Sequence, residues 1–114
     1  MEPYFATDRL KIYHGDCRDV LTQLPDESVQ TVVTSPPYYG LRDYQVDGQI
    51  GLEQTPDDYI TSMVEVFREV RRVLRADGTL WLNMGDSYLQ NKNLLAIPWR
   101  LALALQADGW WLRQ

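Results

Sequence analysis

The feature that most limits the fold of this 114-residue chain is the segment VQTVVT at residues 29–34, which runs directly into two prolines. Valine and threonine are β-branched and favour extended backbone, so the segment predicts a β-strand. Pro36 and Pro37 have no backbone N–H to give to a sheet, so the strand must stop there. The sequence therefore predicts a strand that ends abruptly at the turn Ser35-Pro36-Pro37-Tyr38.

The segments beside this strand have weaker patterns. Residues 9–13 alternate enough to predict a short strand, and apolar residues at helical spacing in residues 18–24 predict a two-turn helix. Asp16 precedes that helix and is a residue type that caps helix N-termini. Residues 39–56 contain three glycines and no sustained period, which indicates a long loop. Long loops in compact domains often carry function.

A long helix is predicted next, with Thr55 as its cap and Pro56 in its first turn. Its apolar residues recur every three or four positions, and Asp77-Gly78 is expected to end it with the glycine in the left-handed conformation. The pattern is completed by a strand at residues 79–84, an amphipathic helix at 93–107 and the start of a strand at 110–114. The order β-α-β-loop-α-β-α-β predicts an α/β fold with a mostly parallel sheet and flanking helices.

The composition is that of an ordinary globular domain, and we expect residues 1–114 to fold as one unit in the cytoplasm. No apolar run has the length of a signal peptide or of the ~20 residues in a membrane span. Cys17 and His14 are the only residues of their types, so neither an internal disulfide nor a metal site is expected. The net charge of −5 argues against DNA binding. The argument is weak, because the acidic residues crowd into residues 57–69, which are expected to form one solvated helix face that can lie far from a substrate groove.

The turn at residues 35–38, which follows the strand predicted at residues 29–34, has the chemistry of a binding site. In open α/β sheets, ligands bind beyond the carboxyl ends of the strands, which is where this turn stands. The serine oxygen and a proline carbonyl could accept both protons of an exocyclic base amine and draw its nitrogen lone pair toward an electrophilic methyl group. Tyr38 could stack on a base extruded from a duplex, an interaction worth roughly 1–3 kcal/mol. The competing interpretation is a stiff turn whose tyrosine packs on the core.

Four ordered motifs favour the first interpretation: HGDCRDVL at residues 14–21, TSPPYYGLRDY at 34–44, GQIGLE at 48–53 and GTLWLNMGDSY at 78–88. With these motifs, nearly the whole chain resembles the DNA adenine-N6 and cytosine-N4 amino-methyltransferase family, in the group whose TSPPY motif precedes the cofactor motif. The resemblance implies a partial Rossmann-like fold that depends on S-adenosylmethionine. It also implies site-specific DNA methylation in a bacterial or phage restriction-modification setting.

The same resemblance implies roles for individual residues. The residues implied to hold the flipped target base are Ser35, Pro36, Pro37 and Tyr38. The residues implied to border S-adenosylmethionine are Asp16 and Cys17, in the Gly-Asp turn after the first strand, together with Thr34 and Ser35. For Asp16 a helix N-cap is an equally good interpretation, and one residue can serve both roles.

One motif of the family is absent from this chain. Its glycine-rich cofactor turn, Phe-x-Gly-x-Gly, occurs nowhere in the sequence, and the family order implies that this turn and the target-recognition segment follow the catalytic motif. We therefore expect residues 1–114 to be the catalytic part of a methyltransferase domain. On their own, these residues are expected to bind S-adenosylmethionine weakly and not to methylate DNA. The strands ending at Gly15 and Thr34 would then not pair directly, and their unpaired edges would favour instability or homo-oligomers.

Some residues keep two interpretations. Asp86 is slightly better explained as a turn residue than as a site residue. Arg42 and Asp43, in the loop after the motif, would touch DNA or gate the site, and a surface ion pair is an equally good interpretation. The tryptophans are interpreted as core and interface packing rather than as base-stacking groups: Trp81, Trp99, Trp110 and Trp111.

Two rival functions also stay open. An RNA or protein methyltransferase can use a related Asn-Pro-Pro-Tyr turn, and the serine at position 35 argues against it. A non-catalytic remnant could instead act as a binding or assembly module. Between the two target amines, Ser35 mildly favours cytosine N4 over adenine N6.

Overall fold

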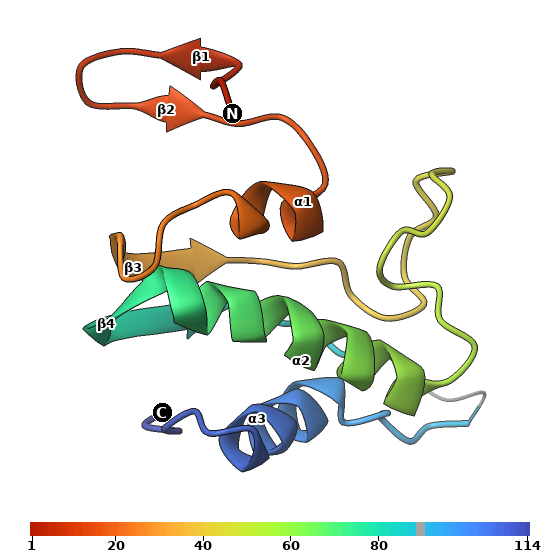
Figure 1. Ribbon diagram of the computed structural model, residues 1–114. Coiled ribbons are helices and arrows are strands. Elements are labelled where there is room, and N and C mark those ends of the chain that lie inside the picture. The colour runs from red at the N-terminus through yellow and green to blue at the C-terminus, as the bar shows by residue number, and fades with distance from the viewer. Residues whose placement is uncertain (89–90) are drawn as a thin grey trace.

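The computed structural model describes residues 1–88 and 91–114. Its elements follow the chain in the order β1 (Phe5–Ala6), β2 (Lys11–Ile12), α1 (Cys17–Thr22), β3 (Val29–Thr34), α2 (Pro56–Val73), β4 (Leu74–Leu82) and α3 (Ile97–Ala107) (Figure 1). The α/β class and the bounds of β3 agree with the sequence prediction. The long loop is also confirmed, since no helix or strand lies between Thr34 and Pro56.

Strands β3 and β4 form a parallel pair, and this pair places the candidate site. The register runs from Thr31 opposite Thr79 to Thr34 opposite Leu82. The Asn83 N–H donates to the Thr34 carbonyl at 2.9 Å and extends the pairing by one residue. Because the strands are parallel, the segments that follow both of them leave from the same edge of the sheet.

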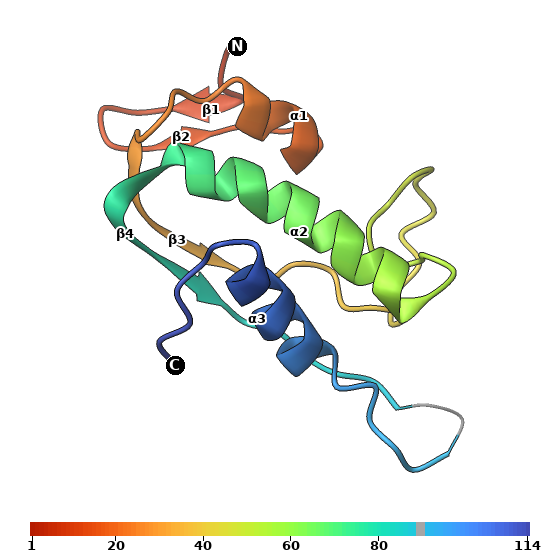
Figure 2. The same ribbon diagram turned by 60° about the horizontal axis from the view of Figure 1, so that its bottom comes forward.

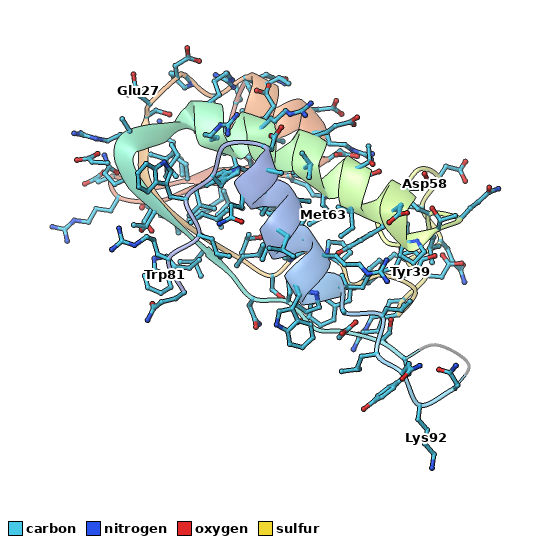
Figure 3. The ribbon with its side chains drawn as sticks, turned by 90° about the horizontal axis from the view of Figure 1, so that it is seen from below. Glu27, Tyr39, Asp58, Met63, Trp81 and Lys92 are labelled. Carbon is cyan, nitrogen blue, oxygen red and sulfur yellow. The ribbon has the colours of Figure 1, made fainter. Side chains whose placement is uncertain are left out.

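Helices α2 and α3 cover one face of this strand pair (Figure 2). The core consists of buried residues from both helices and from the segment before α3: Tyr59, Met63, Phe67, Val70, Leu95, Ile97, Leu101 and Leu105. Figure 3 shows Met63 in the middle of the molecule, where the two helices meet. Val32, Leu80 and Leu82 point from the strands into the same core.

The opposite face of the strand pair is open. Val33 and Trp81 are opposite each other in the register, and their exposed fractions are 77% and 56%. Packing in the core is therefore the wrong interpretation for Trp81, and also for Trp99 and Trp111, which are exposed at 61% and 85%, whereas their packing at an interface stays a prediction. Trp110 is the exception, because it packs against the core cluster.

Two predicted helix caps are present. The Asp16 carboxylate accepts a hydrogen bond from the Arg18 N–H at 2.9 Å, and the Thr55 hydroxyl accepts one from the Asp58 N–H at 3.1 Å. Pro56 stands in the first turn of α2, where its missing N–H costs nothing. These caps explain why both helices begin where they do.

The predicted end of α2 is wrong. The helix stops at Val73 rather than at Asp77-Gly78, because Leu74 is already extended. The segment before β3 also binds the last carbonyls of the helix. The Glu27 N–H donates to the Arg72 carbonyl, and the Ser28 N–H donates to the Val73 carbonyl. Gly78 lies within β4 and is not among the residues with positive φ. A Cβ on Gly78 would lie 2.8 Å from the Gln30 carbonyl, so the glycine permits close approach of β3.

The predicted start of the last helix is also wrong. Helix α3 begins at Ile97 instead of residue 93, because Ala96 has a left-handed conformation with φ of 61°. Gly109 follows the helix with φ of 108°, as the sequence indicates. No strand forms at residues 110–114 in the part of the chain that the structure describes, because an extended segment needs a neighbouring strand to pair with.

The predicted strand at residues 9–13 is reduced to β2, which pairs with β1 in an antiparallel hairpin that the sequence did not indicate. This hairpin forms a sheet of its own, so the strands before Gly15 and before Ser35 do not pair, in agreement with the expectation. Figure 1 shows the hairpin at one end of the molecule, beyond α1. Across the described ranges, no helix combines the length and the apolar character of a membrane span.

Candidate functional site at the edge of the parallel strands

The turn Ser35-Pro36-Pro37-Tyr38 leaves the carboxyl end of β3 and belongs to no helix or strand, as its prolines predict. Ser35 and Pro37 are exposed, whereas Pro36 and Tyr38 are partly buried. The hydroxyls of Ser35 and Tyr38 are 3.5 Å apart, at the outer limit of a hydrogen bond. The serine oxygen is therefore accessible from solvent and only weakly engaged.

The Pro37 carbonyl is held by a residue that the sequence did not single out. Tyr59 of α2 donates its phenolic hydrogen to this carbonyl at 2.6 Å, and its side chain has an exposed fraction of 0%. Burial, with the nearby Glu53 and Tyr38, raises the pKa of the Tyr59 phenol above its usual value, so the phenol stays protonated as a donor. By contrast, the Pro36 carbonyl has no hydrogen-bond partner within residues 1–88 and 91–114.

The ring of Tyr38 lies against the backbone of Gly85, in the segment that follows β4. A Cβ at Gly85 would overlap Cε2 of the Tyr38 ring and lie 2.8 Å from its Cδ2. Sequence reasoning missed this glycine, although its position three residues after β4 was a usable signal, since parallel strands deliver their following segments to one edge. The ring is therefore supported by protein backbone on the side of its Cε2 and Cδ2 atoms.

The long loop after the motif is closed at its base. The Gly40 N–H donates to the Gly51 carbonyl at 2.7 Å, and the Tyr39 hydroxyl donates to the Glu53 carbonyl at 3.0 Å. Gly51 has φ of 118°, and a Cβ there would lie 3.1 Å from the Tyr38 carbonyl, so only glycine fits without strain. Figure 3 shows Tyr39 beside the N-terminal end of α2.

Arg42 and Asp43 bind the loop to itself rather than to each other. The Arg42 carbonyl accepts a hydrogen bond from the Gln49 side chain at 2.9 Å, and the Asp43 carboxylate accepts one from the Gln45 N–H at 2.7 Å. Neither residue forms an ion pair in the described parts of the chain. The alternative of a surface ion pair is therefore wrong.

Asp16 caps α1 and also binds Arg18, whose guanidinium donates to both carboxylate oxygens at 3.0 and 2.6 Å. These hydrogen bonds lower the pKa of the Asp16 carboxyl to about 2. A carboxylate offers about four lone pairs, and three are used here, so one remains for a ligand. Partial burial and the Asp16 charge raise the pKa of the neighbouring Cys17 thiol, which is therefore a neutral group.

The Gly-Asp turn and the motif lie toward the same edge. Figures 1 and 2 show the N-terminal end of α1 on the side to which β3 points. Thr34 is the last residue of β3 and its carbonyl is engaged by Asn83, while Ser35 begins the turn. The acceptor oxygens of the Asp16 carboxylate and of the exposed Ser35 hydroxyl suit the hydroxyl and amino groups of S-adenosylmethionine, which would donate to them.

Asp86 has a larger role than a turn residue. Its Oδ1 accepts hydrogen bonds from the Ser87 N–H at 2.8 Å and from the Ile97 N–H at 3.1 Å. Because Ala96 has no capping side chain, this carboxylate supplies both the acceptor and the negative charge for the N-terminus of α3. Asp86 thus ties the segment that supports Tyr38 to the helix behind it.

A family model described as DNA methylase, N6_N4_Mtase, matches residues 29–114, from β3 through α3. The chain belongs to this DNA methylase family. Type II methyltransferase M.SfiI of Streptomyces fimbriatus is 52% identical over 118 residues, which cover 90% of this chain and 28% of the relative. Type II methyltransferase M.SmaI of Serratia marcescens is 47% identical over 131 residues, which cover 90% of this chain and 45% of the relative.

The fold of this member of the DNA methylase family is confirmed by a solved structure, PvuII DNA methyltransferase (cytosine-N4-specific). The two superpose with a TM-score of 0.77 at 22% identity, over 94% of this chain and 36% of that one. The described elements are thus part of a Rossmann-like methyltransferase fold. The chain spans less than half the length of the curated relatives named above.

Proposed function

We propose that the DNA methylase containing this chain transfers a methyl group to an exocyclic amine of a DNA base, cytosine N4 or adenine N6. The observation that carries this proposal is the turn from Ser35 to Tyr38: its serine oxygen is only weakly engaged, its Pro36 carbonyl has no partner among the described residues, and an aromatic side chain follows at Tyr38. Membership of the family and the type II methyltransferase relatives support the same reaction and a restriction-modification setting.

The geometry sharpens which groups would hold the amine. The Pro37 carbonyl already accepts a hydrogen bond from Tyr59, so Ser35 Oγ and the Pro36 carbonyl are the less engaged acceptors for the two amine protons. Accepting both protons turns the nitrogen lone pair away from the ring and makes the nitrogen a nucleophile. Tyr38, supported from behind by Gly85, would stack on the flipped base and replace the stacking lost from the duplex.

S-adenosylmethionine, when bound, would supply the electrophilic methyl group. We propose that Asp16 uses its remaining lone pair to hold a hydroxyl or amino group of this cofactor, next to Cys17, and that Thr34 and Ser35 border it on the other side. The proton lost from the amine can leave after methyl transfer, so the site needs no strong general base. Residues 1–114 would then form the catalytic part of the enzyme, acting on DNA in the bacterial cytoplasm.

The test uses the full-length gene product that carries these residues, incubated with methyl-labelled S-adenosylmethionine and DNA. Digestion to nucleosides then identifies the labelled base as N4-methylcytosine or N6-methyladenine. Ser35→Ala and Tyr38→Ala should abolish labelling, whereas Tyr44→Ala, in an exposed loop position, should retain it.

The outcomes separate the alternatives. Retained labelling in Ser35→Ala and Tyr38→Ala would contradict the site assignment. No labelling of DNA by the unaltered protein, and no crosslinking of the cofactor to it, would favour the non-catalytic binding module. Labelling of RNA or protein in place of DNA would favour the other rival.

A further inference from the structure

Tyr59 connects the candidate site to the hydrophobic core. Its ring is fully buried in α2, with its centroid 5.4 Å from that of Tyr39, and its hydroxyl is 2.6 Å from the Pro37 carbonyl. The bond joins residues 22 positions apart in the chain, across the whole long loop. A buried polar atom needs a partner, so this contact fixes the carbonyl as firmly as the core fixes the ring.

The position of this bond matters because of the two prolines. Their rings fix φ at residues 36 and 37, and a residue that precedes a proline is restricted to extended conformations, which limits ψ at Ser35 and Pro36. Pro37 is followed by Tyr38, so its own ψ has no such restriction. The Tyr59 hydrogen bond holds the Pro37–Tyr38 peptide plane and thereby sets ψ of Pro37, which the prolines leave free.

We propose that Tyr59 is a positioning residue for methyl transfer, which fixes the Pro37–Tyr38 peptide and so places the Tyr38 ring relative to Ser35 Oγ and the Pro36 carbonyl. This inference rests on the proposed function, since it concerns the same base-holding turn. Tyr59 would not touch the substrate. Its effect would reach the base through the orientation of Tyr38, which Gly85 supports from the other side.

Tyr59→Phe in the full-length gene product tests the proposal, because it removes one hydroxyl and keeps the buried ring. Tyr39→Phe is the matched control: its ring is adjacent, and its hydroxyl also donates to a backbone carbonyl, that of Glu53 at 3.0 Å. Both variants lose one hydrogen bond of similar kind, so their melting temperatures should fall by similar amounts. Kinetics are measured well below both melting temperatures.

We expect kcat of Tyr59→Phe to fall about tenfold, the change in rate that corresponds to one hydrogen bond, with KM for DNA changed less than about twofold. Tyr39→Phe should keep kcat within about twofold of the unaltered protein, since its bond does not reach the motif carbonyls. A second readout uses pyrrolocytosine or 2-aminopurine in place of the target base. Its emission in the complex should differ between Tyr59→Phe and the unaltered protein, because stacking on Tyr38 changes.

Unchanged kcat and emission in Tyr59→Phe would overturn the proposal, and so would equal losses in both variants, which would indicate a general structural effect. If the unaltered protein transfers no methyl group, the proposed function fails by itself. The emission measurement then still tests the placement of Tyr38, because it requires base binding but no chemistry.

Discussion

The backbone of Gly85 lies in close contact with the ring of Tyr38. The space beside the ring is so small that a single methyl group at position 85 would overlap it. Gly85→Ala should therefore displace Tyr38 and lower the methylation rate of the full-length protein at least about tenfold, because small misplacements at a reacting centre are costly. The rate is measured by transfer of labelled methyl groups to DNA under saturating conditions.

Gly78→Ala is the matched control for this prediction. It also creates a close contact, 2.7 Å from the Leu74 side chain and 2.8 Å from the Gln30 carbonyl, but none with Tyr38. Its effect should be on thermal stability, with the methylation rate per folded molecule unchanged. If both alanine variants lower that rate equally, the contact between Gly85 and Tyr38 has no special role.

Asp16 leads to a prediction about pH. Its folded-state pKa of about 2 is lower than its ordinary value of 3.8, so its ion pair with Arg18 stabilises the fold above pH 4, and this contribution is lost as the pH falls through 2. Asp16→Asn keeps a good helix cap and removes the charge. Because both side chains are more than 40% exposed, the variant should cost less than about 1 kcal/mol at pH 7.

The measurement is urea unfolding of the unaltered chain and of Asp16→Asn between pH 7 and the lowest pH at which both fold. The difference in free energy of unfolding should shrink steadily below pH 4. Asp47→Asn, at an exposed loop carboxylate with no ion pair in the described residues, controls for loss of a charge alone. If the difference in free energy of unfolding between Asp16→Asn and the unaltered chain grows as the pH falls, the ion pair of Asp16 with Arg18 does not stabilise the fold in this way.

Among the elements, α3 is unusual because its N-terminus is capped from a distance. Asp86 accepts from the Ile97 N–H, while the preceding Ala96 is left-handed and offers no cap. Asp86→Ala should therefore destabilise the chain by roughly 1–2 kcal/mol, the value of a lost helix cap. Thermal or urea unfolding measures this, with Asp77→Ala as the control because Asp77 is 78% exposed. Equal stability of the two variants would contradict the capping role.

The sequence predicted those elements whose bounds are set by residues within the same segment. Strand β3 was predicted with its bounds because β-branched residues and prolines act on their own segment, and the caps at Asp16 and Thr55 are equally local. The predicted end of α2 and the predicted start of α3 were wrong, because a hydrogen bond from Ser28 and the left-handed backbone of Ala96 determine where these helices stop and begin. The motif was found from its prolines and serine. Tyr59 acts through a tertiary contact that no short pattern encodes, whereas Gly85 could have been found from its position just after β4.

At the scale of the whole molecule, charge limits what this chain does with DNA. The net charge is −5, and within residues 1–88 and 91–114 six of the eleven Lys and Arg side chains form ion pairs: Arg18, Arg68, Arg71, Arg72, Arg75 and Arg100. Residues 1–114 alone should therefore bind a short DNA duplex no more tightly than about 100 μM at physiological salt, the weak end of non-specific binding. Fluorescence anisotropy at low and physiological salt measures this.

The full-length gene product serves as the reference for that measurement, since a basic segment elsewhere in it would add affinity and a steep salt dependence. A dissociation constant below about 1 μM for residues 1–114 would show that this chain carries its own DNA-binding surface.

The closed base of the long loop has a consequence for how such sequences change over time. Three bonds join its two ends: Gly40 to Gly51, Tyr39 to Glu53, and Tyr59 to Pro37. They separate the motif from the exposed loop tip around Val46. The tip has a second anchor, because Arg18, the ion-pair partner of Asp16, donates to the Gly48 carbonyl at 3.0 Å. Substitutions at Val46 can therefore accumulate without moving Ser35 or Tyr38, whereas changes at Gly48 also disturb the pair of Arg18 with Asp16.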